Sequence, residues 1–484
     1  MKFNKKAIIC MIMILSMLLG GCGTSLGSSV KKVKLDPDNP TRVVVWHYYN
    51  GDQLEAFNKL IDEFNGSVGK KEGIYVEGSN FGTVNELKDN IGAAVKHRTG
   101  AEAIPNIFAG YADTVYEVDK LGYVVDLKEY LTQEEQDKYI KSYIEEGEFS
   151  GDGSLKIFPT AKSTEIFMLN KTDWNKFAEA TGADLNDLKT IEGVTKTAQA
   201  YYEWTDSQTK KKNDGKAFFG RDALANYFII GAKQLGTDIF SVKDGKVTLD
   251  FDKEVIRKIW DNYYVPFVKG YFAASGKFRS DDINTGNILS FVGSSAGATF
   301  FPDEVIVDDT RSYPIDMEVL EAPEFEGGEN YAVQQGAGMA VTKTDEKQMY
   351  ASVQFLKWFT EDERNIQFSV ASGYLPVTKT ANDVKKIEET TNLTGNNELP
   401  IVKAAIDTVN HNTLYTTKAF EDGTDARNIL EYAMSDKASA DRKTVVKRLE
   451  KGESFDEAVK DFVSDSNFDT WYEATKAELE KLVK

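Results

Sequence analysis

Apolar and polar positions alternate in two different rhythms along the first part of the chain. Short β-branched and apolar runs are typical of buried strands, whereas apolar residues spaced three and four apart are typical of amphipathic helices. The pattern predicts strands at 42–46, 74–77 and 104–109, and helices over 54–64, 87–95 and 115–121. Strands that alternate with helices in this way predict a parallel sheet with helices on both faces.

The same alternation continues less regularly through the rest of the chain. Further strands are predicted at 164–169, 288–292, 317–320 and 337–341. Asp345 is placed to cap a helix that carries apolar residues up to Phe359, and the chain from about Arg427 is predicted to be helical. The fold class is therefore α/β, and the length of 484 residues suits two or three domains or one two-lobed unit.

The amino-terminal residues have the pattern of an export signal. Lys2, Lys5 and Lys6 precede an apolar run over 7–19, which is too short for a permanent membrane span and typical of a secretory signal. The run ends in Leu-Gly-Gly-Cys22, which resembles the bacterial lipobox and implies that Cys22 is lipidated. The alternative is an ordinary signal peptide with an incidental cysteine. Two acyl chains would anchor the protein stably.

We therefore expect residues 1–21 to be a lipoprotein signal peptide. Residues 22–41 are rich in small and polar residues and contain two prolines, which is typical of a flexible tether. No other apolar run is long enough to cross a membrane. The body of the protein is expected on the extracellular face of the bacterial cell membrane, attached to it only through Cys22.

Charge and composition exclude several classes of function. The chain has 58 Lys and Arg against 77 Asp and Glu, a formal net charge of −19, and loss of residues 1–21 with their three lysines leaves −22. This acidity disfavours nucleic-acid binding, which needs clustered Lys and Arg. Because only two cysteines and three histidines are present, we expect no disulfide framework, no metal site and no cofactor.

Catalytic signatures are scarce in the sequence. It has no G-x-x-x-x-G-K-[ST] phosphate loop and no H-E-x-x-H pair. A Ser-His-Asp triad would have to use His47, His97 or His411, and the last two lie in polar segments. We therefore expect a protein that is not an enzyme. A surface glycosidase is the alternative, because the carboxylates are too many for the sequence to exclude an acid/base pair.

Two stretches carry motifs that point to a family. The first is Phe158-Pro-Thr-Ala-Lys-Ser-Thr-Glu-Ile-Phe-Met-Leu-Asn-Lys-Thr-Asp-Trp174, and the second runs over 351–364 and ends in Ser-Gly-Tyr-Leu-Pro-Val-Thr at 372–378. They resemble the proline-led crossing strand, the helix with an acidic cap and the Gly-Tyr-Leu-Pro segment of family 1 extracellular solute-binding proteins of bacterial ABC importers. Leu169 stands where the family has tyrosine. The similarity spans nearly all of residues 42–470.

The resemblance implies a two-lobed fold of the periplasmic-binding-protein type II class. Each lobe would be a mainly parallel sheet flanked by helices, and several hinge strands would cross between the lobes. The boundaries that it suggests are 42–163 and 323–362 for lobe 1, and 164–322 and 363–484 for lobe 2.

Within the family the chain is most similar to the sugar and glycerol-3-phosphate-binding branch. This likeness rests on Trp46-His47, 162–164 and 373–378. However, the segment 417–421 reads Thr-Lys-Ala-Phe-Glu where glycerol-3-phosphate-binding proteins hold an arginine, and Ala112 replaces their glutamate. Burial of a phosphate beside Glu421 without a matching arginine is unfavourable. We therefore expect a sugar or oligosaccharide ligand, with glycerol-3-phosphate or another phospho-polyol as the alternative.

A sugar site needs aromatic rings for the apolar faces of the sugar and polar side chains for its hydroxyls. In α/β sheets these groups lie where strands end, and the resemblance adds the crossing and cleft segments. The candidate ligand-binding residues are His47, Tyr48, Tyr49, Asn80, Phe81, Tyr111, Asp113, Ser163, Ser294, Ser295, Gln335, Gly336, Tyr374 and Glu421. Structural alternatives remain: Tyr48 and Tyr49 cannot both face the cleft, Asp113 can cap a helix, and Ser163 and Gly336 can be hinge positions.

The resemblance also implies partners. The lobes would close on the ligand, and a permease in the membrane would recognise the closed form. The expected partners are therefore a small carbohydrate and the transmembrane subunits of an ABC permease, with a monomeric protein and no nucleic acid. A sensor subunit that presents bound sugar to a receptor is a further alternative.

Overall fold

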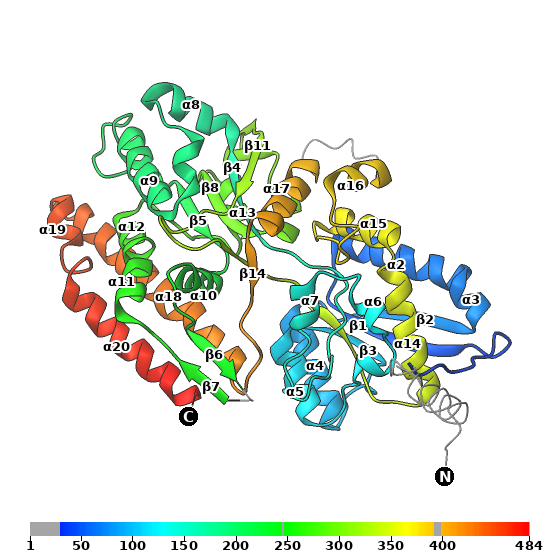
Figure 1. Cartoon of the computed structure of the whole chain (residues 1–484). Coiled ribbons are helices and arrows are strands. Elements are labelled where there is room, and N and C mark those ends of the chain that lie inside the picture. The colour runs from blue at the N-terminus through cyan, green and yellow to red at the C-terminus, as the bar shows by residue number, and fades with distance from the viewer. Residues whose placement is uncertain (1–29, 244–245, 392–397, 484) are drawn as a thin grey trace, which may run out of the picture.

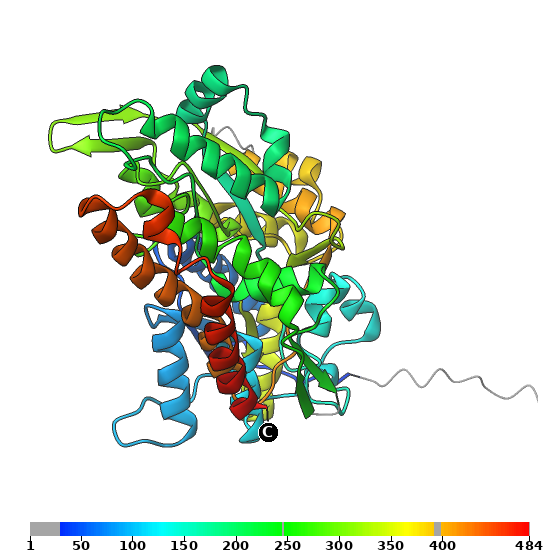
Figure 2. The same ribbon diagram turned by 90° about the vertical axis from the view of Figure 1, so that its left-hand side faces the viewer.

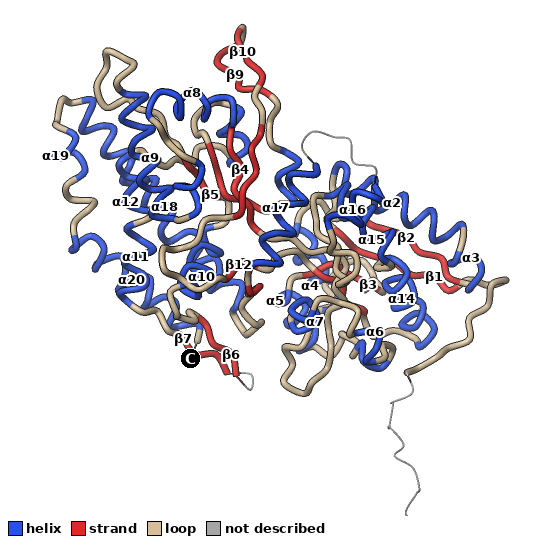
Figure 3. The backbone as a smooth tube through the Cα atoms, turned by 45° about the horizontal axis from the view of Figure 1, so that its top comes forward, coloured by secondary structure: helices blue, strands red, loops and turns tan. Residues whose placement is uncertain are grey.

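The computed structural model of the chain describes residues 30–243, 246–391 and 398–483. It contains two four-stranded sheets, each covered by helices, which form two lobes side by side (Figures 1 and 3). Lobe 1, on the right in Figure 1, is built around the sheet β13-β3-β1-β2, and lobe 2 around the sheet β11-β4-β8-β5. The predicted α/β two-lobed fold class is confirmed. Cys22 lies outside the described residues.

Lobe 1 follows the strand and helix pattern predicted from the sequence. Its central strand β1 pairs in parallel with β2 and β3, and β13 adds to β3 in the antiparallel direction. Helix α2 turns Phe57, Leu60, Ile61 and Phe64 toward this sheet, because the four residues share one helix face. The strands are β1 Thr41–His47, β2 Ile74–Asn80, β3 Ile107–Gly110 and β13 Gly338–Val341. The helices are α2 Gly51–Gly66, α3 Val68–Glu72, α4 Val84–Val95, α5 Ala112–Lys120, η1 Leu127–Glu129, α6 Gln133–Gln136, α7 Lys141–Glu145 and α14 Glu346–Phe359.

The sheet of lobe 2 is buried on both faces. Phe167 and Leu169 of β4 belong to one hydrophobic core, and Ile166 and Met168 of the same strand belong to another. The strands are β4 Glu165–Asn170, β5 Phe219–Arg221, β8 Ser290–Ser294 and β11 Met317–Glu321. The helices are α8 Lys171–Thr181, η2 Leu185–Lys189, α9 Ile191–Asp206, α10 Leu224–Gln234, α11 Lys253–Asp261, α12 Tyr264–Lys269, α13 Arg279–Asn284, η3 Ser295–Phe300, α18 Gly423–Glu450, α19 Phe455–Val459 and α20 Asp465–Leu482.

One detail of the predicted fold needs correction, because the sheet of lobe 2 is not mainly parallel. Only β5 and β8 pair in parallel, and β4 is antiparallel to both β8 and β11. The reason is that β4 leads the chain away from the segments that join the lobes, whereas β8 and β11 lead it back. Ser294, at the end of β8, pairs with Glu165, at the start of β4.

The remaining elements are short two-stranded sheets and the helices α15, α16 and α17. Helix α15 contributes Phe368 to the core of lobe 1 and Ile366 to a core of lobe 2, so it joins the two. The hairpin β9–β10 projects from lobe 2 (Figures 2 and 3), and α18 packs beside α20 in the same lobe. These elements are β6 Phe240–Lys243, β7 Lys246–Leu249, β9 Glu304–Asp308, β10 Arg311–Pro314, β12 Tyr331–Val333, β14 Thr413–Tyr415, α15 Asp362–Ser372, α16 Val384–Thr391 and α17 Glu398–His411.

Extended segments cross between the lobes side by side. Ser163 pairs with Gln335, and Lys162 pairs with Leu375, through antiparallel bridges. Gly336 has a φ of +92°, and a Cβ there would lie 3.0 Å from the carbonyl oxygen of Ala161, so the close approach of the two crossing segments requires glycine. These crossings have the geometry of a hinge.

Residues 30–40, which the sequence analysis assigns to the tether, lie along lobe 1. The backbone N–H of Lys31 donates to the carbonyl of Glu129 at 2.8 Å, and the side chains of these two residues form an ion pair. Leu35 packs against the core of lobe 1. The domain boundaries drawn from the sequence stay a prediction. None of the described helices is long and apolar enough to cross a membrane.

Candidate functional site

A cavity of about 240 Å³ lies between the two lobes, and we call it the interlobe cavity. Lobe 1 lines it with the starts of α4 and α5 and the end of α7, and lobe 2 with α10, β6 and the start of α18. An adjoining recess of about 320 Å³ shares Glu146, Phe240, Gln334, Thr416 and Thr417 with it. The side chains used below are Lys88, Tyr111, Asp113 and Glu146 of lobe 1, Asn226, Phe240, Phe420 and Arg427 of lobe 2, and Gln334 and Gln335 of a crossing segment.

Three helices, α4, α5 and α18, begin at this cavity. Thr83 caps α4 in a capping box with Glu86, so the first turn of α4 faces the cavity. Helix α5 begins directly after β3, as expected where a parallel strand passes into its following helix. Helix α18 begins at Gly423, after Asp422 in a left-handed conformation with a φ of 62°. The positive ends of these helix dipoles are therefore turned toward the cavity.

The wall from lobe 1 carries an aromatic ring and a carboxylate. Tyr111 is 40% exposed, and Asp113 lies next to it in the first turn of α5. Burial raises the pKa of Asp113 to about 6, and Glu117 and Glu146 act in the same direction, while Arg427 and Lys88 oppose the rise. Tyr111 is the N-cap residue of α5, so Asp113 does not cap this helix, and Asp113 lines the cavity.

The floor of the cavity is a buried polar cluster. The ammonium of Lys162, fully buried, forms an ion pair with Oε2 of Glu146, whose side chain is 7% exposed. Lys162 also donates to the carbonyl of Gly336 at 2.7 Å. Gln334 donates to the same Oε2 of Glu146 at 2.7 Å. The cluster thus links the cavity to the crossing segments.

The wall from lobe 2 is organised around Arg427. Its guanidinium donates to Oδ1 of Asn226 at 2.6 Å, and Asn226 donates to Oε1 of Glu165 at 2.9 Å. Glu165 in turn forms a buried ion pair with Arg221. No carboxylate of the described residues lies within ion-pair distance of Arg427, so most of its donors remain free for a ligand.

The lobes touch at the mouth of the cavity. Lys120 of α5 forms an ion pair with Glu421 at 2.8 Å, and Lys88 of α4 donates to Oγ1 of Thr424 at 3.1 Å. A Cβ on Gly423 would lie 2.7 Å from Oδ1 of Asp113, so that carboxylate reaches the first turn of α18. The structure is therefore a closed arrangement of the two lobes.

The structure brings some of the predicted site residues to this cavity. Tyr111, Asp113 and Gln335 line it. Behind Tyr111, the hydroxyls of Tyr48 and Tyr374 lie close enough to influence each other's ionisation, and burial raises the pKa of Tyr48 and Tyr374. Glu421 lies at the mouth, where its side chain is 72% exposed and bound to Lys120.

Four other predicted residues belong to lobe 1 and lie outside the cavity lining. His47 and Tyr49 are buried and stack with a centroid distance of 5.2 Å beside Phe57, and burial lowers the pKa of His47 to about 4. Asn80 holds the turn after β2 by donating to the carbonyl of Tyr49 at 2.7 Å. Phe81 packs on Trp46 with a centroid distance of 4.4 Å. None of these four lines the interlobe cavity.

The predicted serines and Gly336 belong to the crossing region. Ser294 donates to the hydroxyl of Ser163 at 3.2 Å, and the backbone N–H of Ser295 donates to the carbonyl of Thr164 at 2.8 Å. Gly336 accepts from Lys162. These residues hold the crossing segments together next to the cavity.

Residues 293–297, Gly-Ser-Ser-Ala-Gly, fit the G-x-S-x-G pattern of a hydrolase nucleophile elbow. Ser295 is nevertheless fully buried, and its hydroxyl has no hydrogen-bond partner among the described residues. Each histidine is engaged elsewhere: His47 accepts from the backbone of Tyr49, His97 binds Tyr123, and His411 faces Glu321. A Ser-His pair is therefore absent from the part of the chain that the structure describes.

Several cavity residues were not found from the sequence, namely Lys88, Glu146, Asn226, Gln334 and Arg427. Three of them are charged: Lys88, Glu146 and Arg427. Without a further signal, a charged residue of this kind is expected to face solvent and is not singled out as a site residue. Gln334 is the one that could have been predicted, because it is the immediate neighbour of the predicted site residue Gln335. Because Arg427 lines the cavity, the absence of an arginine from segment 417–421 no longer argues against an anionic ligand group.

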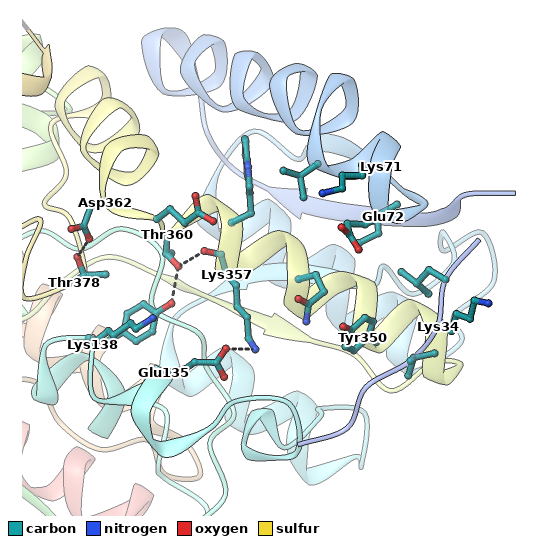
Figure 4. Close-up of a pocket in the computed structure, with 18 of the residues that line it drawn as sticks. Lys34, Lys71, Glu72, Glu135, Lys138, Tyr350, Lys357, Thr360, Asp362 and Thr378 are labelled. Atoms are coloured by element: carbon teal, nitrogen blue, oxygen red, sulfur yellow. Dashed lines mark hydrogen bonds and ion pairs between the residues drawn. The ribbon is translucent and has the colours of Figure 1, made fainter. Parts of the chain in front are cut away.

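A second, larger hollow of about 1140 Å³ is lined mainly by residues of lobe 1, and we call it the outer hollow (Figure 4). Its central polar side chains bind one another: Lys357 pairs with Glu135 at 2.7 Å, and Thr378 donates to Asp362 at 2.6 Å. Within residues 30–243, 246–391 and 398–483, no three His, Cys, Asp or Glu side chains are grouped as a metal site requires.

Comparisons with known proteins agree with this architecture. Among solved structures, the chain is similar to the cyclic alpha-maltosyl-1,6-maltose binding protein from Arthrobacter globiformis, with a TM-score of 0.65, 19% identity and coverage of 92% of this chain and 100% of that one. It is similar to UgpB from Mycobacterium tuberculosis in complex with glycerophosphocholine, with a TM-score of 0.67, 16% identity and coverage of 92% and 100%. It is also similar to the Thermus thermophilus maltotriose binding protein, with a TM-score of 0.59, 18% identity and coverage of 91% and 100%. At these identities the likeness shows a shared fold.

A comparison with curated protein sequences gives no match. A family model does match, over residues 59–395, which is well over half of the chain, and it describes bacterial extracellular solute-binding proteins. The family predicted from the two sequence motifs is thereby confirmed: the chain is a member of the bacterial extracellular solute-binding proteins.

Proposed function

We propose that this solute-binding protein captures a sugar or oligosaccharide in the interlobe cavity and delivers it to an ABC permease. The observation that carries the proposal is the lining of the cavity, where hydrogen-bonding side chains from both lobes surround a space flanked by Tyr111, Phe240 and Phe420. Sugars offer hydroxyls to such polar groups and C–H faces to such rings. Cavity and recess, about 240 and 320 Å³, suit a small ligand.

The charges in the cavity support a ligand that is neutral overall. Arg427 stands against Asp113, Lys88 is paired with Glu117 at 3.2 Å, and Glu146 is paired with Lys162. Charged groups of both signs hydrogen-bond hydroxyls well, whereas an anion would meet Asp113 and Glu146 as well as the two cations. The structural neighbours from Arthrobacter globiformis and Thermus thermophilus are named for oligosaccharides that they bind, which agrees with this choice.

A phosphorylated polyol is the second candidate. The specific observation in its favour is Arg427, whose free donors face the cavity together with Lys88. The neighbour UgpB is described in complex with glycerophosphocholine, a phosphate-bearing ligand. Both candidates share a hydroxyl-rich part, and they differ in the charged group.

In the proposed cycle the lobes open and close about the crossing segments, and the ligand favours the closed form by its contacts with both walls. The protein is attached to the extracellular face of the membrane through lipidated Cys22, acts as a monomer and releases the sugar unaltered. Hydrolysis of ATP belongs to the other subunits of the importer. The lipid anchor is testable by mass spectrometry of the protein purified from membranes, with Cys22→Ser as the unlipidated control.

The ligand class is tested by calorimetric titration of the protein that begins at residue 30. The panel is glucose, maltose, maltotriose, glycerol-3-phosphate and glycerophosphocholine. Binding of a neutral sugar supports the proposal, and binding of the two phosphates alone supports the second candidate. Chromatography of the sugar after incubation checks that it is unaltered, and a cleaved sugar would establish the glycosidase alternative.

A further inference from the structure

We infer that Glu146, Gln334 and Gln335 form an acceptor floor that recognises hydroxyl groups of the ligand, and that Lys162 connects this floor to the hinge. This inference rests on the proposed sugar-binding function. It assigns the specificity for hydroxyls to residues that the sequence analysis did not select, apart from Gln335. We call these three residues the acceptor floor.

Glu146 has one oxygen engaged and one free. Both donors that reach it, the ammonium of Lys162 and the amide of Gln334, bind Oε2. Oε1 has no hydrogen-bond partner among the described residues, and it is not one of the fully buried atoms. Glu146 lines both the interlobe cavity and the adjoining recess, so Oε1 is an open acceptor where these two spaces meet.

The two glutamines add acceptors next to it. The amide nitrogen of Gln334 donates to Glu146 and to the carbonyl of Ser142 at 3.2 Å, and these two acceptors fix the orientation of the amide. Its Oε1 is therefore an acceptor, and this atom and Oε1 of Gln335 are buried without a hydrogen-bond partner in the part of the chain that the structure describes. A buried acceptor without a donor is unfavourable, and a ligand that supplies the donor relieves this.

An acceptor floor selects its ligand by chemistry. A hydroxyl can donate to Glu146 and to the glutamine oxygens, whereas an ionised carboxylate or phosphate has no hydrogen to give and would be repelled by Glu146. The donors of the cavity are on the other side, in Arg427 and Lys88. The floor thus recognises a polyhydroxy part of the ligand, and any charged part would lie toward α18.

Lys162 gives the floor a second role. It forms a buried ion pair with Glu146, and it donates to the carbonyl of Gly336 in the crossing segment. Lys162 is itself on the other crossing segment, where it pairs with Leu375. A ligand hydroxyl that binds Oε1 of Glu146 is therefore connected, through the ion pair of Glu146 with Lys162, to both crossing segments. Lys162 is a positioning residue, since it does not reach the cavity itself.

The test compares Glu146→Gln with wild-type protein by calorimetry, using the tightest binder among glucose, maltose and maltotriose and the monodeoxy analogues of that sugar. In the variant the amide oxygen is expected to take the place of Oε2, next to two donors, so that an NH₂ group replaces the open acceptor. We expect a loss of at least tenfold in affinity. One monodeoxy analogue should lose about tenfold on wild-type protein and show no further loss on the variant.

Two additional variants keep the test decisive. Gln335→Leu removes an acceptor without disturbing the ion pair and is expected to weaken sugar binding by threefold to tenfold. Glu135→Gln removes the carboxylate of the partly exposed ion pair with Lys357 in the outer hollow, and it should leave affinity unchanged. If wild-type protein binds the sugar but Glu146→Gln and Gln335→Leu bind every analogue as wild-type does, the acceptor floor is wrong and the proposed function stands. If wild-type protein binds none of the neutral sugars, both are wrong.

Discussion

The interlobe cavity and the outer hollow differ in how their polar side chains are used. In the outer hollow, Lys357 and Glu135 bind each other, and Thr378 binds Asp362. The lysines around it, Lys34, Lys71 and Lys138, are exposed to water. In the smaller interlobe cavity, Gln334 and Gln335 keep buried acceptors without donors.

This difference shows that volume is a poor guide to a binding site. The outer hollow is several times larger, with about 1140 Å³ against about 240 Å³, yet the two polar pairs at its centre are satisfied, and its one buried lining atom without a partner among the described residues is a donor, Nε1 of Trp358. Buried polar groups without partners are uncommon in folded proteins, and a cavity that keeps them is organised for a ligand that completes them. The site is therefore identified by its unsatisfied groups and by its position between two lobes.

The largest expected effect is on the free energy of unfolding, and it comes from breaking the ion pair at each of the two sites. Lys162→Met leaves the carboxyl of Glu146 buried without its ion-pair partner, which is expected to lower the free energy of unfolding by about 3–5 kcal/mol. Lys357→Met breaks the partly exposed pair with Glu135 and should cost less than about 1 kcal/mol. Urea denaturation followed by circular dichroism measures both. Equal losses in the two variants would contradict the distinction between the sites.

The second prediction concerns opposite pH dependences of two carboxyls. Burial raises the pKa of Asp113 to about 6 from 3.8, so its contribution to stability is fully present below about pH 4 and is lost as the pH rises through 6. Two pKa units correspond to about 3 kcal/mol. We expect Asp113→Asn to match wild-type stability near pH 4 and to exceed it at pH 7, as measured by urea denaturation across this range.

Glu135 in the outer hollow is the control with the opposite sign. Burial alone would raise the pKa of Glu135, but hydrogen bonds from Lys357 and the backbone of Thr132 hold it below its usual value. Its contribution is therefore present above the unfolded pKa and is lost as the pH falls. Glu135→Gln should lose stability at pH 7 and match wild-type protein at low pH. The same slope for both variants would refute the contrast.

The third prediction tests the wall from lobe 2. Arg427→Ala removes the free donors that face the cavity, and we expect the affinity for the bound sugar to fall by about tenfold to a hundredfold. Arg427→Lys should restore only part of it, because a lysine cannot make the same paired hydrogen bonds. Lys138→Ala at the outer hollow should have no effect. Calorimetric titration of all three variants decides between a ligand contact and a structural role at Asn226.

Much of the fold follows from periodicity in the sequence. The strand at 42–46, the helix behind it and the cap at Asp345 are seen as β1, α2 and the N-cap of α14, because these segments bury one face and their local signals agree with it. Strand direction in lobe 2 was missed, since periodicity shows which residues are buried and not which way the chain enters a sheet. Helix α18 begins at Gly423, a few residues before the predicted helical start at Arg427.

The site was harder to predict for a physical reason. Tyr111 and Asp113 follow β3, and the strand-end rule finds them because it depends on one sheet alone. His47 and Tyr49 obey the same rule but turn inward, where Phe57 and Phe368 offer aromatic contacts. Arg427 and Glu146 come to the cavity only when the two lobes lie together, and no pattern within one segment encodes that approach.

The smallest expected effect concerns the contact across the mouth of the interlobe cavity. Lys120 and Glu421 belong to different lobes and their side chains are 46% and 72% exposed, so their attraction is weakened by water and salt. The pair nevertheless exists only when the lobes are closed, and any free energy it supplies therefore shifts the balance between the open and closed forms. Lys120→Ala should weaken sugar binding by less than about threefold, and the effect should vanish in 1 M salt.

The matched control is Lys141→Ala, because Lys141 and Glu145 form an ion pair within lobe 1 alone, and this variant should leave the affinity for the sugar unchanged. Exchange of the charges in Lys120→Glu with Glu421→Lys should restore affinity, because the pair is reformed with the opposite orientation. A loss that persists in this double variant would mean that Lys120 acts through the ligand or the helix, and not through closure of the lobes.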